Sequence, residues 1–133
     1  MNKKHIEVVA AVLKNESEFL AVQRALSKLD YVSEKWEFPG GKVEAGETLV
    51  TAITRELNEE LRITVNNPKF LLTIEHNYPD FDITMHCFVI DVPTRELELT
   101  EHIDSRWLPK DQLWEVDWAA ADIPVVEKLQ STL

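Results

Sequence analysis

The chain has 133 residues, of which 44% are hydrophobic and 29% charged, a composition typical of one globular domain with a buried core. Its formal net charge of −10 argues against a protein that binds DNA or another polyanion over a broad surface. The single cysteine, Cys87, excludes an intrachain disulfide and a cysteine-rich zinc site, and no apolar run reaches membrane-spanning length. We therefore expect one cytoplasmic domain over residues 1–133 that contacts neither a membrane nor a nucleic-acid polymer.

The first part of the chain predicts strands. Residues Ile6 to Leu13 are rich in Val and Ala and predict a buried strand, and Phe19 to Gln23 predict its partner across a polar turn. Residues Leu26 to Lys35 have mixed polarity without a clear period, which predicts a long loop that edges or covers a pocket. Trp36 to Pro39 then alternate apolar and polar residues as a short strand that ends at the proline.

Two glycines and a lysine follow this strand directly. Gly40 and Gly41 allow backbone torsions closed to other residues and let a ligand approach the main chain, while Lys42 supplies a point charge for a phosphate. A tight turn explains the same glycines without any ligand. The stretch is not a Walker loop, because Val43 replaces the hydroxyl residue that such a loop uses to bind Mg²⁺.

An amphipathic helix is the next predicted element. Its apolar stripe, at spacings of three and four, consists of Val50, Ile53, Leu57 and Leu61. Glu56, Glu59 and Glu60 share the side next to the stripe, with Glu60 nearest to it and Glu59 farthest round. Like charges at this spacing repel, so either the face is solvated or it binds a hard cation such as Mg²⁺ through oxygen ligands.

The spacing from Gly41 to Ile63 carries a family resemblance. Gly41, five residues, Glu47, seven residues and then Arg55-Glu56-Leu57-x-Glu59-Glu60-x-x-Ile63 resemble the signature of the Nudix hydrolases, which cleave nucleoside diphosphates linked to another moiety. The resemblance implies that Glu47 and Arg55 brace the loop against the helix. One position departs from the signature, because Arg62 stands where the family usually has glycine. We expect the helix to run on past Arg62 rather than to end there in a left-handed cap.

Further roles follow from this resemblance. It implies that the catalytic residues are the signature carboxylates Glu56, Glu59 and Glu60, together with Glu101. Glu101 is included because MutT-like Nudix enzymes place a loop carboxylate six residues before a tryptophan strand, as Glu101 is before Trp107. The cofactor implied is Mg²⁺, with Mn²⁺ as an alternative. The metal would be held by Gly40, Glu56, Glu59, Glu60 and Glu101.

The expected nucleotide contacts are Arg24, Gly40, Gly41, Lys42, Tyr78, Phe81 and Asp122. In MutT-like enzymes an arginine at the matching strand end lies near the nucleotide, although Arg24 also reads as a surface charge. Strands are predicted at Phe70 to His76 and Ile83 to Val92, and the aromatics Tyr78 and Phe81 in the turn between them either stack on a base or pack under the hairpin.

The last predicted element is an amphipathic helix that begins at Asp122-Ile123-Pro124 and follows a short strand at Arg106 to Leu108. Asp122 is expected to act as its N-cap, and its position also matches a base-contacting residue of MutT-like enzymes. The whole order of elements predicts an α/β fold, a mixed sheet between helices that resembles the Nudix α/β/α sandwich.

Together these features resemble the MutT and CTP pyrophosphohydrolase branch of the family. The implied function is an Mg²⁺-dependent nucleoside triphosphate pyrophosphohydrolase that releases a nucleoside monophosphate and pyrophosphate from a (d)CTP-type or 8-oxo-dGTP substrate. The alternative is a non-catalytic Nudix-fold module that binds or senses a nucleotide, from which loss of carboxylates would be expected. The partner is thus a small nucleotide, and the chain is expected to be a monomer or homodimer.

Overall fold

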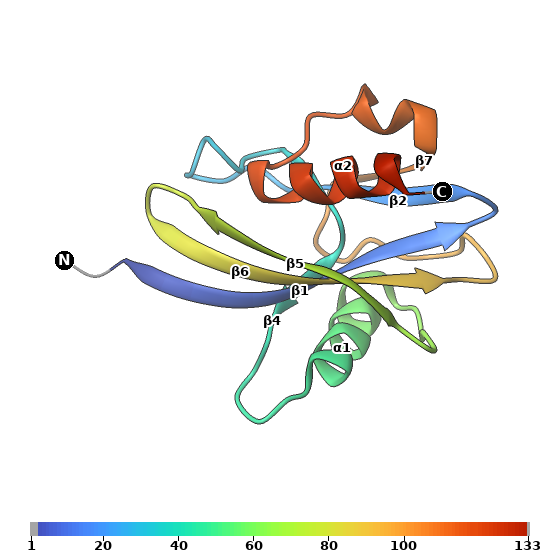
Figure 1. The fold of residues 1–133 in the computed structure, drawn as a ribbon, viewed down its shortest axis with the longest axis horizontal. Helices are drawn as coiled ribbons and strands as arrows, with labels where there is room; N and C mark the ends of the chain where they lie inside the picture. Colours follow the sequence, from blue (N-terminus) through green and yellow to red (C-terminus); the bar gives the residue numbers. More distant parts are fainter. Residues whose placement is uncertain (1–2, 133) are drawn as a thin grey trace.

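The computed structural model describes residues 3–132, and strand β1 (Lys4–Asn15) lies at the centre of their sheet (Figure 1). It pairs in parallel with β6 (Phe81–Asp91) along its whole length. On its other edge it pairs antiparallel with β4 (Gly40–Lys42) and, near its end, with β2 (Glu18–Gln23). The central strand therefore contacts both the glycine segment and the later half of the chain.

The remaining strands extend the sheet on both sides. On one side β5 (Lys69–Asn77) pairs antiparallel with β6 and forms an edge. On the other side β2 pairs with both β3 (Trp36–Glu37) and β7 (Asp104–Pro109). The sheet is thus mixed, as the sequence predicts.

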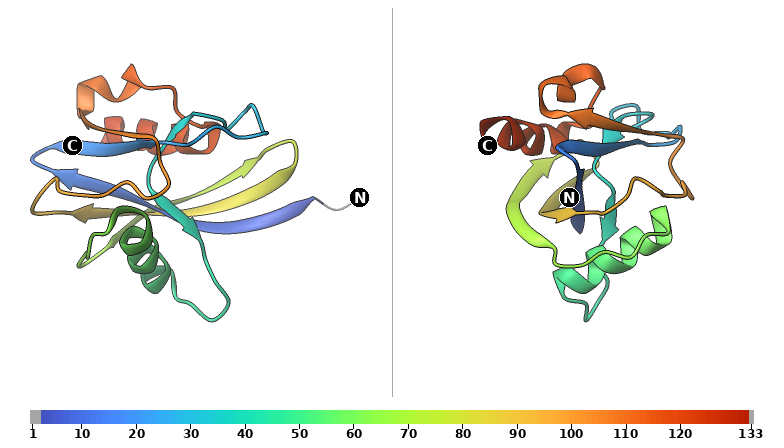
Figure 2. Two further views of the ribbon diagram at one scale, coloured as in Figure 1. Left: turned by 180° about the vertical axis from the view of Figure 1, so that it is seen from behind. Right: turned by 90° about the vertical axis from the view of Figure 1, so that its right-hand side faces the viewer.

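Helices cover the two faces of the sheet. The helix α1 (Leu49–Leu61) lies on one face and α2 (Ile123–Ser131) on the other, as both Figure 1 and Figure 2 show. Two short 3₁₀ helices, η1 (Lys110–Glu115) and η2 (Ala120–Asp122), lead from β7 into α2. The predicted α/β/α layering is confirmed. Within residues 3–132 no helix is both long and apolar enough to cross a membrane.

Alternation along β1 produces two cores. Val9, Ala11 and Leu13 pack in the cluster that includes α1, whereas Ala10 and Val12 pack in the cluster that includes α2. Because both faces of the strand are buried, its sequence is a continuous apolar run without polar alternation.

The order of exposure around α1 agrees with the predicted helical face. Glu60 is buried, the Glu56 side chain is 13% exposed and the Glu59 side chain is 59% exposed. The apolar stripe differs at one position, because Val50 is 46% exposed and Ala52 is buried in its place. Val50 lies in the first turn, where the helix extends past the edge of the core.

The two ends of α1 have different caps. The Thr48 hydroxyl accepts a hydrogen bond from the Thr51 N–H at 3.1 Å and so caps the N-terminus. The C-cap is Arg62, with φ 58° and ψ 37°, so the expectation that the helix runs on past this residue is wrong. The left-handed turn lets Ile63 pack back onto the α1 core, and burial there outweighs the local strain.

Candidate active site

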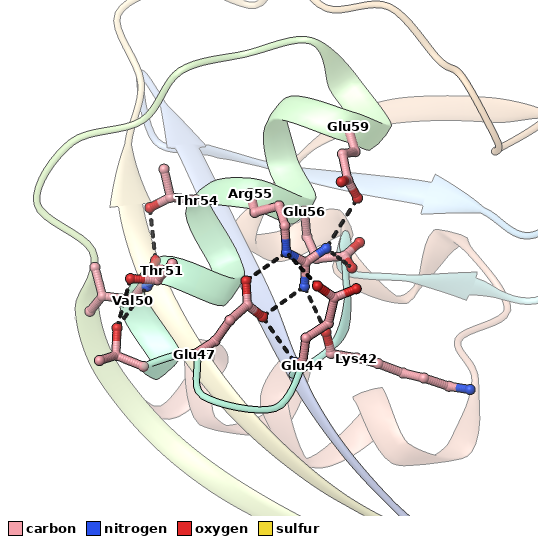
Figure 3. Close-up of polar contacts among 10 residues, drawn as sticks. Lys42, Glu44, Glu47, Val50, Thr51, Thr54, Arg55, Glu56 and Glu59 are labelled. Carbon is pink, nitrogen blue, oxygen red and sulfur yellow. Dashed lines mark hydrogen bonds and ion pairs between the residues drawn. The ribbon is translucent and has the colours of Figure 1, made fainter.

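Arg55 holds the loop between β4 and α1 against the helix (Figure 3). Its Nε and Nη2 donate hydrogen bonds of 2.7 and 2.9 Å to the two oxygens of Glu47, and Nη2 also donates to the Lys42 carbonyl at 3.0 Å. These bonds lower the pKa of Glu47 to about 2, because they favour the ionised carboxylate. The predicted bracing by Glu47 and Arg55 is confirmed.

The same guanidinium contacts two of the predicted catalytic carboxylates. Arg55 Nη1 donates to Glu56 at 2.9 Å and to Glu59 at 3.1 Å. Glu56 in turn lies against Gly41, where a Cβ atom would be 2.4 Å from the carboxylate. Gly41 is therefore a glycine because a side chain would displace Glu56.

Close packing also explains Gly40. A Cβ atom there would lie 1.9 Å from the carbonyl oxygen of Val9 on the paired strand β1. The expectation of unusual torsions at Gly40 and Gly41 is wrong, because both lie in the extended strand β4, and a positive φ of 83° occurs instead at Gly46. Both positions therefore need glycine because there is no room for a side chain, and the main chain of β4 lies close to the carboxylates of α1.

Glu60 is the buried member of the carboxylate face. Its Oε1 accepts a hydrogen bond from the Gly40 N–H at 3.3 Å. Burial raises the pKa of Glu60 to about 9, and the negative charges of Glu56, Glu37 and Glu101 add to the shift. Three further carboxylates therefore lie near this point beside β4, where Glu60 meets the Gly40 N–H.

Glu101 reaches this point because its loop is fastened to the end of α1. The Thr100 N–H and hydroxyl donate to the Glu60 carbonyl at 3.1 and 3.0 Å, and the hydroxyl also donates to the Glu59 carbonyl at 2.9 Å. On its other side the loop is bound to β2, where the Ile103 N–H donates to the Gln23 carbonyl at 3.0 Å.

A cleft of about 540 Å³ joins the carboxylate face to an aromatic region. Nine of the residues predicted from the sequence line this single cleft: Arg24, Gly40, Gly41, Lys42, Glu60, Tyr78, Phe81, Glu101 and Asp122. Glu56 and Glu59 are not among its lining residues and lie behind it, in contact with Arg55. The loop predicted to edge a pocket does so through Leu26, Ser27 and Val32.

Aromatic side chains form the far end of the cleft. Tyr78 is buried and stacks on Tyr31 at 5.2 Å between ring centroids, and Phe81 lies 5.1 Å from it in a tilted arrangement. The Tyr78 hydroxyl accepts a hydrogen bond from the Ala121 N–H at 3.0 Å, which ties the β5–β6 turn to η2. Tyr78 therefore packs in the core, one of the two expected alternatives, and it also lines the cleft.

Asp122 lies at this end and occupies the expected N-cap position of α2. Within residues 3–132 its side chain makes no capping hydrogen bond to α2. Its Oδ1 instead accepts from the Phe38 N–H at 3.1 Å, because the residue has helical torsions that turn the side chain toward β3. Burial and the nearby Glu37 charge raise the pKa of Asp122 well above its ordinary range.

Two residues of the cleft wall were missed from the sequence. Glu37 binds Arg24 through Oε1 at 3.1 Å and His102 through Oε2 at 2.9 Å. His102 is 65 positions away from Glu37, and no local spacing connects them. The one signal in the sequence is that Glu37 is the polar position of an otherwise apolar strand.

The donor set at the carboxylate face fits a hard divalent cation by its chemistry. Glu56, Glu60 and Glu101 could supply oxygen ligands, and a cation would relieve their mutual repulsion, which adds to the effect of burial on the pKa of Glu60. Among the described residues no three His, Cys, Asp or Glu side chains are already arranged to hold a metal. The Arg55 guanidinium contacts Glu56 and Glu59 instead, so these two side chains must turn to reach an ion.

Comparison with known proteins settles the family. The NUDIX domain model matches residues 3–129. The chain belongs to the Nudix family. A curated Nudix relative, the 8-oxo-dGTP diphosphatase of Escherichia coli K12, is 30% identical over 127 residues and covers 96% of this chain and 98% of its own. The CTP pyrophosphohydrolase of the same strain is 32% identical, covering 93% and 90%.

Solved structures agree with this Nudix assignment. The MutT protein from Methanosarcina mazei Go1 superposes with a TM-score of 0.85 and 26% identity, covering 98% of this chain and 96% of its own. The predicted resemblance, fold class and enzyme class are thus confirmed: the chain is a Nudix hydrolase with the α/β fold of its family. Nudix hydrolases generally use divalent metal ions, which agrees with the donor set described above.

Proposed function

We propose that this Nudix hydrolase is a nucleoside triphosphate pyrophosphohydrolase that uses Mg²⁺, with Mn²⁺ as an alternative. Water would cleave the bond between the α- and β-phosphates, and the products would be a nucleoside monophosphate and pyrophosphate. The observation that supports this most directly is that one cleft joins a carboxylate face to an aromatic end that carries Asp122. A nucleoside triphosphate would use both ends of the cleft, the carboxylate face for its metal-bound phosphates and the aromatic end for its base.

At the phosphate end, Glu56, Glu59, Glu60 and Glu101, together with Gly40, would hold the ion. When bound, the ion offsets phosphoryl charge and lowers the pKa of a water molecule. A bound cation would favour the ionised form of Glu60, and in that form its carboxylate could accept a proton from water. Lys42 and the main chain at Gly41 border this end and would meet the phosphates.

At the base end, Tyr78 and Phe81 would contact the flat face of the base and Asp122 its polar edge. Arg24 lines the wall between the two ends. The relatives named 8-oxo-dGTP diphosphatase and CTP pyrophosphohydrolase favour two substrate types, 8-oxo-dGTP and (d)CTP-type pyrimidines. Asp122 lines the cleft at this end, where a carboxyl group can hydrogen-bond with the polar edge of a base.

The test is pyrophosphate release over a panel of cytosine, guanine and 8-oxoguanine nucleoside triphosphates with Mg²⁺ or Mn²⁺. We expect turnover of at least one nucleotide that falls by orders of magnitude in Glu60→Gln and is retained in Glu127→Gln, an exposed carboxylate on α2. Nucleotide binding without any turnover would instead support a non-catalytic Nudix module. The intact carboxylates argue against that alternative.

The setting of the reaction is part of the same proposal. The substrate would be a free nucleotide and not a nucleic-acid polymer, because the net charge of −10 repels a long phosphate backbone. We also propose a cytoplasmic location and a monomer or homodimer. Fractionation and light scattering of the purified chain test these points.

A further inference from the structure

The Glu37 carboxylate is held from two sides in the wall of the cleft. Arg24 Nη1 donates to its Oε1 at 3.1 Å, and His102 Nε2 lies 2.9 Å from its Oε2. The His102 side chain is 5% exposed. Among the described residues, Arg24 Nε and His102 Nδ1 have no hydrogen-bond partner, so the polar groups around Glu37 are not satisfied by the protein alone.

Glu37 adjoins both ends of the cleft. The next residue, Phe38, donates its N–H to Asp122 at the base end, and the Glu37 carboxylate binds His102, the neighbour of Glu101 at the phosphate end. In a nucleotide the sugar lies between the base and the α-phosphate.

The charge of Glu37 determines what it can contact. Its carboxylate forms an ion pair with Arg24 at 3.1 Å and contacts the His102 ring at 2.9 Å. An ionised carboxylate repels phosphate oxygens and only accepts hydrogen bonds. A substrate group beside Glu37 must therefore be a donor, and the donors of a nucleotide outside its base are the sugar hydroxyls.

We propose that Glu37 accepts a hydrogen bond from a sugar hydroxyl of the bound nucleotide and so sets the sugar preference of the enzyme. Arg24 and His102 are positioning residues that act through Glu37, because both bind its oxygens and fix the direction of its lone pairs. The inference rests on the proposed nucleotide substrate and adds a sugar contact to it.

The experiment measures kcat/KM on the triphosphate that turns over fastest and on its 2′-deoxy, 3′-deoxy and 2′,3′-dideoxy analogues. For the wild type we expect removal of the hydroxyl that Glu37 contacts to lower kcat/KM about 10- to 100-fold, the usual effect of losing a hydrogen bond to a charged group. In Glu37→Leu the ratio of kcat/KM between the nucleotide with this hydroxyl and the analogue without it should fall below about 3-fold, since the variant has no acceptor. Glu37→Gln keeps one neutral acceptor oxygen and should give an intermediate ratio.

The control is Glu7→Leu. Glu7 also pairs with a histidine, His86, at 2.8 Å, but lies on strand β1 outside the cleft lining. Its loss should leave the sugar ratio at the wild-type value. The proposal is overturned if removal of each hydroxyl changes the wild-type kcat/KM by less than twofold. It is also overturned if Glu37→Leu folds and keeps the wild-type ratio of kcat/KM between the sugars. Should Glu37→Leu fail to fold, Glu37→Gln decides, and a ratio equal to that of the wild type overturns it.

A second measurement separates this proposal from the proposed hydrolysis. Calorimetric binding of the corresponding nucleoside monophosphates, with and without each hydroxyl, needs no turnover. A sugar preference that disappears in Glu37→Leu supports the contact even if no triphosphate is hydrolysed. Equal affinity of the wild type for all four sugars overturns the contact even if hydrolysis is fast.

Discussion

Glu60→Gln is expected to stabilise the metal-free protein while it destroys activity. The folded carboxyl has a pKa of about 9 against an ordinary value of 4.5, so the folded chain binds more protons than the unfolded chain between these limits. The stability from Glu60 is therefore fully present below pH 4.5 and is lost as pH rises toward 9. Glutamine stays neutral throughout and can still accept from the Gly40 N–H.

The size of the effect follows from this gap. Between pH 4.5 and pH 7 the loss is at most about 3 kcal/mol, since one pH unit corresponds to roughly 1.4 kcal/mol. Neighbouring carboxylates also raise the pKa of Glu60 in the unfolded chain, so we expect about 1–3 kcal/mol. For a chain of this length that amounts to a rise in Tm of roughly 4–12 °C at pH 7.

The assay is thermal unfolding of the metal-free wild type, Glu60→Gln and the exposed control Glu127→Gln at pH 5, 7 and 8.5. The difference between Glu60→Gln and wild type should grow with pH, whereas the control should follow the wild type. Added Mg²⁺ should raise the Tm of the wild type more than that of Glu60→Gln. A Tm difference that stays constant from pH 5 to 8.5 would refute the argument from burial.

Four further substitutions test other parts of the structure. Arg62→Gly should raise stability by about 1 kcal/mol in thermal melts, because φ is 58° at this residue, and a lower Tm would show that the cap is unstrained. Asp122→Asn should keep or raise the Tm, because burial raises the pKa of this carboxyl, but it should shift the kcat/KM ratio between nucleobases about 5- to 150-fold, and an unchanged substrate profile would make the residue purely structural. Gly41→Ala should fold yet lose turnover, because its Cβ displaces the Glu56 carboxylate, whereas Gly40→Ala should lower the Tm, because its Cβ meets the rigid Val9 carbonyl. Full activity of Gly41→Ala would contradict this account.

The parts of the site that the sequence predicts are those with local periodicity. The helical spacing from Glu56 to Glu60 determines which carboxylate faces the core, and the structure agrees with that order. The signature spacing likewise predicts the Glu47–Arg55 contact, because a loop of fixed length returns the glutamate to the helix. The sequence also predicts the mixed sheet with a helix on each face.

Contacts across the sheet were not predictable in the same way. The Asp122–Phe38 bond joins residues 84 positions apart, and the segment that leads to Asp122 is placed by a bridge between Trp118 and Trp36 of β3. The proline in the first turn of α2 suggests that Asp122 caps the helix through its side chain. The side chain makes no capping hydrogen bond, because it contacts Phe38 instead. At Arg62 local propensity favours a longer helix, and burial of Ile63 overrides that preference.

The segment from Phe38 to Gly40 has a consequence for how such an enzyme can change its substrate. Its two N–H groups bind Asp122 from the start of α2 and Glu60 from α1, two elements on opposite faces of the sheet. With the proposed roles, substitutions around Asp122 would alter base recognition without moving the carboxylates proposed to act in hydrolysis. A one-residue insertion between Phe38 and Gly40 would instead reverse the facing of every later side chain in the segment. We therefore expect changes of substrate specificity to arise from substitutions at the start of α2 and not from insertions within residues 38–40.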